Sequence, residues 1–259
     1  MLNYTTHTLD MRPLEVAHLN PLKRTSVKRI IAVGDSITAG ACSSNADEMA
    51  WPVQLMDMLS HKDQFEVINL GVSGRTMMKK GDYPYWNEQA YKWALMSSAD
   101  IVLLMLGTND SKTFQWDQEA FRADYLEMAT NFKNMDSKPE VYLMVPPPLY
   151  QDGAYSMNQT VINDVLPTMI PQMAADLGLP SENVIDIMGA MGGKSLSSWQ
   201  FFCDGQNCDA CHPNDAGYAH VASHIYKRLF LAPLPTGSWQ PQTMAGKPEE
   251  DGTQFLQGW

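Results

Sequence analysis

The sequence predicts an α/β protein, a three-layer αβα sandwich in which helices cover both faces of a parallel five-stranded sheet. Short apolar runs alternate with longer segments whose apolar residues recur at helical spacing, which is typical of repeated β-α-β units. The run at 101–106 is apolar throughout, as in strands that are buried on both faces of a parallel sheet. The 259 residues, of which 44% are hydrophobic, are enough for one large core.

The expected elements follow one another in order. The first strand, 29–33, runs into a Gly-Asp-Ser turn, and the first helix, 51–59, carries Trp51, Leu55 and Leu59 on one face. The other strands are predicted at 66–70, 101–106, 141–145 and 184–187, and the other helices at 86–96, 118–134, 158–177 and 213–229. A flavodoxin-like strand order, 2-1-3-4-5, would make the first and third strands neighbours, and ligands bind at the carboxyl ends of such a pair.

Polar residue types with complementary chemistry follow these strands. Ser36 comes after the first strand, Gly74 lies shortly after the second, and Asn109 follows the third. His212 precedes the last helix, and Asp209 stands three residues before it, close enough for its carboxylate to hold the imidazole. A serine nucleophile, a histidine base and an orienting carboxylate form a catalytic set for acyl transfer. The alternative for Ser36 alone is that it caps the following helix.

These motifs resemble the SGNH (GDSL) hydrolase family over roughly residues 29–230. The order Ser, Gly, Asn, His matches, and Asp209, His212 and Pro213 match its final Asp-x-x-His-Pro motif. The resemblance implies that Ser36, Asp209 and His212 are catalytic. It also implies that the oxyanion hole is formed by the backbone N–H groups of Ser36 and Gly74 and the side-chain amide of Asn109. The G-x-S-x-G elbow of α/β-hydrolases is absent around Ser36.

Two aspartates beside these residues are expected to support the site. Asp35 is expected to bond the backbone of its own turn, and Asp110 to do similar work after Asn109. Gly71 is expected to shape the chain where it leaves the second strand, and not to take part in catalysis.

The segment after Gly74 mixes aromatic and charged residues, which suits a sugar. The aromatic residues Tyr83, Tyr85 and Trp86, interleaved with charged residues, are expected to stack on a sugar face and to bond its hydroxyl groups. Arg75 is expected to meet the carboxylate of an acidic sugar. The alternative is that these aromatic residues begin a helix and fill the core. Together with residues 106–111, this segment resembles the carbohydrate acetylesterase and sialate-O-acetylesterase-like branch of the family, which implies a short-chain, above all acetyl, ester substrate.

Other functions remain open from the sequence. A general short-chain esterase, a thioesterase or a lysophospholipase would use the same catalytic set, and an inactive binding module could share the fold. The residues 208–212 also read as C-x-x-C-H, the attachment pattern of c-type haem, and with Cys203 they resemble a zinc loop. Because His212 already belongs to the Asp-x-x-His-Pro motif, we expect no metal or organic cofactor.

The cysteines indicate the redox compartment. Three of the four lie within nine residues, at 203, 208 and 211, and the fourth is Cys42. Such a cluster is typical of disulfide bonds in an oxidising compartment, and of the three possible pairings we expect Cys203–Cys208 with Cys42–Cys211. A secreted or extracytoplasmic protein is therefore expected, with its signal peptide absent from this sequence. A cytoplasmic location is the alternative.

Composition and motif spacing limit the partners and the domain count. The net charge is −11 and no basic stripe is present, which argues against nucleic acid. No stretch of 18 apolar residues could span a membrane, and nothing specifies an oligomer. We expect an N-terminal arm at 1–28, one hydrolase domain at 29–232 and a tail at 233–259 that packs on or near it.

Overall fold

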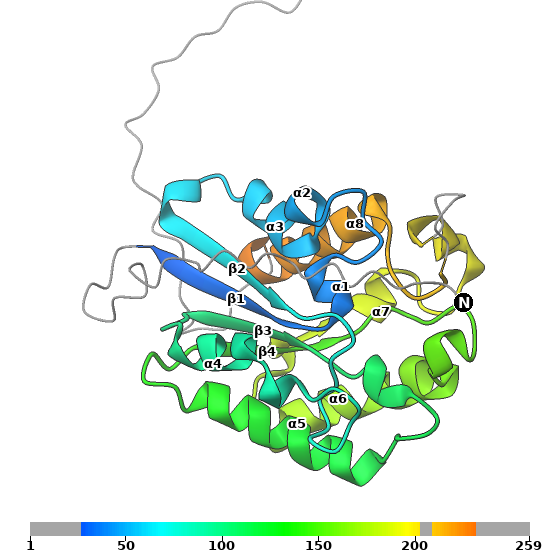
Figure 1. The fold of residues 1–259 in the computed structure, drawn as a ribbon. Coiled ribbons are helices and arrows are strands. Elements are labelled where there is room, and N and C mark those ends of the chain that lie inside the picture. Colours follow the sequence, from blue (N-terminus) through cyan, green and yellow to red (C-terminus); the bar gives the residue numbers. More distant parts are fainter. Residues whose placement is uncertain (1–26, 203–208, 232–259) are drawn as a thin grey trace, which may run out of the picture.

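A computed structural model describes residues 27–202 and 209–231 of the chain (Figure 1). The expected tail at 233–259 and nearly all of the expected N-terminal arm at 1–28 lie outside these residues. So do Cys203 and Cys208.

The centre of the molecule is a five-stranded sheet in which every neighbouring pair is parallel. Its strands are β1 (Lys28–Gly34), β2 (Phe65–Gly71), β3 (Ile101–Met105), β4 (Glu140–Val145) and β5 (Val184–Asp186). Their order is β2-β1-β3-β4-β5. The predicted fold class and strand order are therefore confirmed.

Helices cover both faces of the sheet (Figure 1). The helices on one face are α3 (Trp51–Met58) and α8 (Asp215–Tyr226), and those on the other are α4 (Gln89–Met96), α5 (Gln118–Lys133) and α6 (Leu166–Asp176). Alternate residues of each strand enter the two cores. In β1, Ile30 and Ala32 pack with α3 and α8, whereas Ile31 and Val33 pack with α4, α5 and α6. Both faces are buried, which explains the continuous apolar runs in the strands.

Several short elements were not anticipated. They are the helices α1 (Ser36–Ala39), α2 (Ala46–Met49) and α7 (Ile187–Ala190) and the 3₁₀ turns Lys62–Gln64, Tyr85–Asn87, Asn109–Ser111, Ala154–Ser156, Ser181–Asn183 and Leu196–Phe201. A single turn is too short to display a helical period in the sequence, so whether it forms depends on capping and tertiary contacts. The predicted helix 158–177 begins with a π-helical turn, Val161–Val165, and α8 ends in another, Lys227–Leu231.

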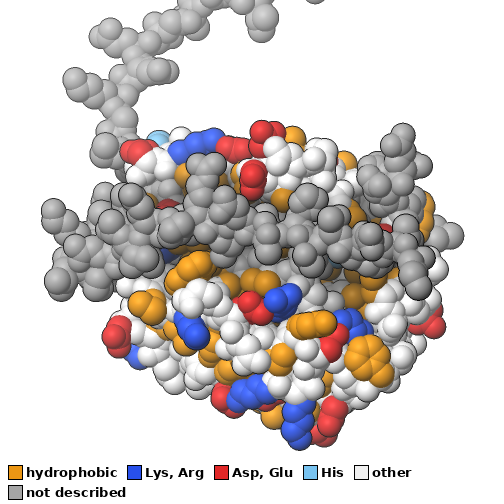
Figure 2. Space-filling model, in the orientation of Figure 1, with side chains coloured by type: hydrophobic (Ala, Val, Ile, Leu, Met, Phe, Trp, Pro, Cys, Tyr) orange, Lys and Arg blue, Asp and Glu red, His pale blue; other side chains and the backbone are white. Residues whose placement is uncertain are grey.

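The visible face carries Lys, Arg, Asp and Glu side chains in mixture, with no large area of one sign (Figure 2). Among the described residues, no helix has the length and apolarity needed to cross a membrane.

The register of the sheet positions the candidate site. Gly34 at the end of β1 pairs with Gly71 of β2 and with Met105 of β3. The segments that follow these three strands therefore leave the sheet at one edge. This is the carboxyl edge, where open α/β sheets bind their ligands.

Candidate active site

The turn after β1 presents Ser36 at this edge. Asp35 caps α1, because its Oδ1 accepts a hydrogen bond of 3.0 Å from the Ile37 N–H. The capping role that was the alternative for Ser36 thus belongs to Asp35, as the sequence predicted for that carboxylate. Gly34 permits the close turn, since a Cβ there would lie 2.7 Å from the carbonyl oxygen of Met105.

Ser36, His212 and Asp209 form a continuous series of hydrogen bonds. The Oγ of Ser36 lies 2.8 Å from Nε2 of His212, and Nδ1 of the same ring lies 2.5 Å from Oδ2 of Asp209. Because a carboxylate only accepts, Nδ1 carries the proton and Nε2 is free to accept from the serine hydroxyl. Ser36 is 8% exposed and His212 is 9% exposed, so the pair is largely shielded from water.

The second oxygen of Asp209 fixes the loop. Asp209 Oδ1 accepts hydrogen bonds from the backbone N–H groups of Cys211, at 3.0 Å, and His212, at 2.8 Å. Burial raises the pKa of Asp209, but the hydrogen bonds from the side chain and backbone of His212, together with the electrostatic interaction between the two residues, outweigh this effect. The pKa therefore lies well below the ordinary value, and the carboxylate stays charged.

Two further groups reach Asp209, and sequence reasoning missed both roles. The phenol of Tyr155 donates to Oδ2 at 3.1 Å, and its ring meets the His212 ring edge-on with centroids 5.8 Å apart. The thiol of Cys42 donates to the same oxygen at 3.2 Å. Tyr155 has a φ of 51°, a left-handed conformation that is uncommon for a residue with a side chain and is enriched at functional sites. No sequence motif marks this tyrosine.

Asn109 lies in the same place although it is 73 positions from Ser36. Its Nδ2 makes a long contact of 3.4 Å to Oδ2 of Asp35, which leaves a second N–H on the amide. Burial raises the pKa of Asp35 to about 6, against the lowering effects of the Ile37 N–H and the nearby His212. The structure therefore brings Ser36, Asn109 and His212 together, with Asp35 beneath them.

Asp110 holds the loop that follows Gly74. Its two carboxylate oxygens accept from the backbone N–H groups of Met77, at 2.9 Å, and Met78, at 2.7 Å. The side chain is fully buried, and burial raises its pKa to about 7 despite these two hydrogen bonds. Asp110 was expected to bond the backbone of its own turn, but its side chain instead ties the turn after β3 to the loop after β2.

The two glycines after β2 differ in their surroundings. Gly74 has a φ of +81°, and a Cβ there would meet no heavy atom within 4 Å, so its backbone faces open space. At Gly71 a Cβ would lie 2.3 Å from the backbone nitrogen of Ala39. Gly71 therefore serves close packing against α1, at the last residue of β2.

The four residues that were expected to contact substrate differ in burial and in the contacts they make within the protein. Tyr85 is fully buried and donates to the Leu70 carbonyl at 2.6 Å, so its assignment as a substrate contact is corrected: it fills the core. Trp86 donates to the Met77 carbonyl at 2.7 Å and is partly buried. Arg75 forms an ion pair of 2.8 Å with Glu88 and lies over the ring of Tyr83. Tyr83 is the exposed aromatic of the set, at 58%.

The expected disulfide between Cys42 and Cys211 is not formed. Cys211 is a buried thiol whose sulfur lies 3.9 Å from that of Met157, whereas Cys42 is exposed and bonds Asp209. The predicted Cys42–Cys211 pairing was wrong because the direction of the loops, which the spacing of cysteines does not reveal, determines which sulfur atoms come together. The expected Cys203–Cys208 pair lies outside the described residues.

The loop that carries Asp209 and His212 also bears on the haem and zinc alternatives, because both would need His212 as a metal ligand. Both ring nitrogens of His212 are engaged, one with Asp209 and one with Ser36, so neither is turned toward a metal. Within the described ranges, the cluster of possible metal ligands is Cys42, Asp209 and His212, which are the atoms of the hydrogen-bonded series itself. The arrangement favours proton transfer over metal binding at this place.

An open parallel sheet with hydrogen-bonded Ser, His and Asp side chains at its carboxyl edge is the arrangement of hydrolases that use a serine nucleophile. Residues 32–220 match the model of the GDSL-like lipase/acylhydrolase family, and the chain belongs to that family.

One curated relative is an acetylxylan esterase of Xylanibacter ruminicola, 31% identical over 223 residues. The alignment covers 79% of this chain and 44% of the relative, so the chain spans less than half the length of that protein.

Two solved structures share the fold. A lipase/acylhydrolase from Enterococcus faecalis has a TM-score of 0.59 and 24% identity, covering 78% of this chain and 94% of that one. A carbohydrate acetylesterase from Sinorhizobium meliloti has a TM-score of 0.58 and 16% identity, covering 78% and 97%.

Proposed function

We propose that the protein is a serine esterase that hydrolyses short-chain, chiefly acetyl, esters carried by carbohydrate. The observation that carries the proposal is the hydrogen-bonded series Ser36–His212–Asp209 at the carboxyl edge of the sheet. Membership of an acylhydrolase family and the acetylxylan esterase relative support the reaction and the substrate class.

The first half of the reaction forms an acyl-enzyme. The Ser36 hydroxyl gives its proton to Nε2 of His212 while Oγ attacks the ester carbonyl carbon. Asp209 stabilises the imidazolium and keeps Nδ1 protonated. When the carbon–oxygen bond to the sugar breaks, the departing alkoxide takes the proton from His212 and leaves as an alcohol.

The second half returns the enzyme to its resting state. Nε2 of His212 removes a proton from water, and the hydroxide attacks the acyl carbon. The bond to Ser36 Oγ breaks, the serine recovers its proton from His212, and acetic acid leaves. The proposed proton transfers use only these side chains, the substrate and water.

In both halves of the reaction, negative charge develops on the carbonyl oxygen of the ester and must be stabilised by hydrogen-bond donors. We assign these to the backbone N–H groups of Ser36 and Gly74 and the Asn109 amide, with Asp35 and Asp110 as supports. The contact of 3.4 Å between Asn109 and Asp35, and the open space beside the Gly74 Cα, support this assignment.

Acetate release from acetylated xylan and acetylated mannan oligosaccharides tests the proposal, with 4-nitrophenyl acetate and octanoate alongside, for the wild type and Ser36→Ala. Serine-dependent release from a sugar is the expected result. If serine-dependent cleavage is restricted to the nitrophenyl esters, the carbohydrate assignment fails and a general esterase remains. Octanoate preference would favour the thioesterase or lysophospholipase alternative.

A polysaccharide substrate also bears on location. Polymers of this kind are too large to enter a cell intact, so a protein that deacetylates them works outside the cytoplasm. We propose a secreted or extracytoplasmic enzyme on that ground, and cell fractionation of the source organism tests it.

A further inference from the structure

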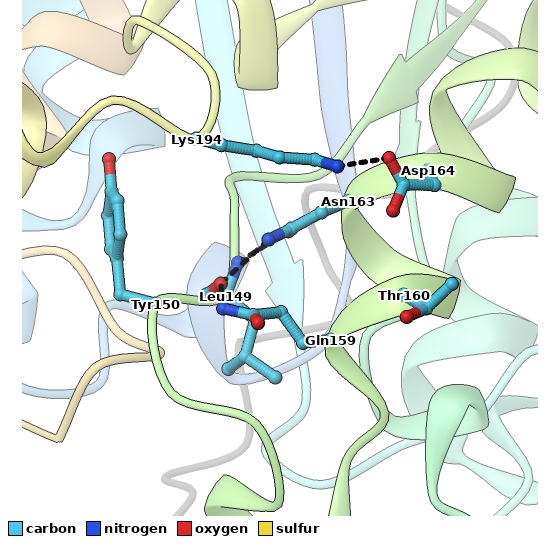
Figure 3. Close-up of a pocket in the computed structure, with 7 residues that line it drawn as sticks. All are labelled: Leu149, Tyr150, Gln159, Thr160, Asn163, Asp164 and Lys194. Carbon is cyan, nitrogen blue, oxygen red and sulfur yellow. Dashed lines mark hydrogen bonds and ion pairs between the residues drawn. The ribbon is translucent and has the colours of Figure 1, made fainter.

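A cavity lies next to the loop that carries Asp209. It has a volume of about 260 Å³ and is lined by Leu149, Tyr150, Gln159, Thr160, Asn163, Asp164 and Lys194 (Figure 3). These residues come from the loop after β4, the start of the π-helical turn before α6, and the segment after α7. We propose that this cavity binds one neutral sugar ring of the glycan that carries the ester. This inference rests on the proposed function.

The walls of the cavity are held in place by the protein's own hydrogen bonds. The Asn163 side chain accepts from the Leu149 N–H at 2.9 Å and donates to its carbonyl oxygen at 2.8 Å. The Tyr150 hydroxyl donates to the carbonyl oxygens of Gly193, at 3.3 Å, and Ser195, at 3.4 Å. Because the Tyr150 side chain and the loop at Leu149 are already fixed in this way, they lose little conformational entropy when a ligand binds.

The charges in the cavity favour a neutral ligand. Lys194 reaches toward Asp164 and forms an ion pair with it, so the single cation and the single anion of the lining offset each other (Figure 3). A phosphate or a carboxylate would have to compete with Asp164 for the ammonium group. An acyl chain would remove water from the Gln159 and Thr160 side chains without offering them a hydrogen bond, which is costly.

The remaining polar groups match a hydroxyl-rich ring. Gln159 uses its Nε2 to donate to the Leu149 carbonyl at 2.7 Å, which leaves its Oε1 to accept from a sugar hydroxyl. The exposed Thr160 offers a hydroxyl that both donates and accepts. Tyr150 lies on the other side of the cavity from Thr160 and Asp164 (Figure 3). The volume falls below the roughly 300–1,000 Å³ of pockets for drug-sized ligands, which suits one ring rather than several.

The backbone links the cavity to the active-site loop. The Tyr150 N–H donates to the carbonyl oxygen of Ala210 at 2.9 Å, and Ala210 stands between Asp209 and Cys211. The same loop continues to Tyr155, which bonds Asp209. A sugar chain lying along this loop would contact the catalytic residues and the cavity together, so the cavity is placed to hold a ring of the chain next to the acetylated one.

The test measures binding separately from catalysis. Isothermal titration calorimetry with unesterified xylotetraose and mannotetraose is carried out on the wild type, Thr160→Trp and Thr130→Trp. Thr160→Trp places an indole in the mouth of the cavity, and Thr130→Trp makes the same change at an exposed position of α5, outside the cavity. We expect binding of at least one oligosaccharide to the wild type and to Thr130→Trp, and its loss in Thr160→Trp.

Gln159→Ala supplies a milder variant that keeps the cavity open. Loss of one hydrogen bond should weaken oligosaccharide binding by roughly two- to tenfold. Far-UV circular dichroism and urea unfolding of Thr160→Trp, compared with the wild type and Thr130→Trp, show whether this variant folds. Equal binding by the wild type and Thr160→Trp, or no binding by the wild type, would overturn the subsite. Binding without acetate release would instead count against the proposed esterase.

Discussion

The phenol of Tyr155 donates a hydrogen bond to the carboxylate of Asp209 across 54 positions of the chain, at 3.1 Å. The bond joins Oδ2, the oxygen that also faces Nδ1 of His212. Burial and the negative charge of Asp209 raise the pKa of Tyr155 to about 12, so the phenol remains a donor throughout the physiological range. Tyr155 therefore holds Asp209 in the orientation that the imidazole requires.

Tyr155→Phe removes this donor and keeps the ring against His212. Hydrogen bonds to charged groups are worth about 1.5–3 kcal/mol, and Tyr155 is exposed, so we expect the lower end, about a tenfold fall in kcat. The KM for 4-nitrophenyl acetate should not change, because the ester does not contact Asp209. Tyr226→Phe, on α8, is the matched control and should keep full activity. A wild-type kcat in Tyr155→Phe would remove the positioning role.

Asn109→Ala tests the proposed oxyanion hole. Removal of one such donor typically lowers kcat by about 10²–10³, because the lost hydrogen bond strengthens as charge develops on the carbonyl oxygen. KM should change little. Asn131→Ala, on α5, removes a hydrogen bond to Tyr91 away from the site and serves as control. A change confined to KM would assign Asn109 to ground-state binding instead.

The parallel sheet was predictable from the sequence, because apolar runs alternate with helices. The meeting of Ser36 and Asn109 depended in addition on the flavodoxin-like strand order, which alternation alone does not select. The Asp-x-x-His-Pro motif gave the local geometry of Asp209 and His212. Tyr155 was not predictable, since its contact depends on a left-handed backbone and on a loop held by the bond from Thr113 N–H to the Ser156 carbonyl. Nor could composition separate buried Tyr85 from exposed Tyr83, because both read equally well as core or as sugar contacts.

Gly74→Ala and Gly71→Ala should separate activity from stability. At Gly74 the added Cβ meets open space, so the cost is the left-handed backbone, about 1 kcal/mol. We expect kcat to fall about tenfold or more, since the backbone donor shifts. At Gly71 the Cβ strikes the backbone of α1, and urea unfolding should show a loss of about 1–3 kcal/mol. Equal losses of stability with no difference in kcat would contradict the assignment of Gly74.

Asp35 makes stability depend on pH in a predictable direction. Because burial raises its pKa from 3.8 to about 6, the folded state binds more protons than the unfolded state between these values. The stabilisation is fully present below pH 3.8 and is lost as the pH rises through about 6. Between pH 4.5 and 7.5 this group alone should lower the free energy of unfolding by about 2 kcal/mol.

The variant Asp35→Asn isolates this contribution, because an amide still caps the Ile37 N–H but does not titrate. Urea unfolding of both proteins at pH 4.5 and pH 7.5 gives the double difference, in which the titrating groups that Asp35 does not influence cancel. The wild type should lose about 2 kcal/mol more than Asp35→Asn as the pH rises. Burial raises the pKa of Asp110 to about 7, which acts in the same direction. Because the charge of Asp35 contributes to that rise, the double difference contains this coupling together with the titration of Asp35. An equal loss in both would mean that the Asp35 carboxyl titrates alike in the folded and unfolded chain.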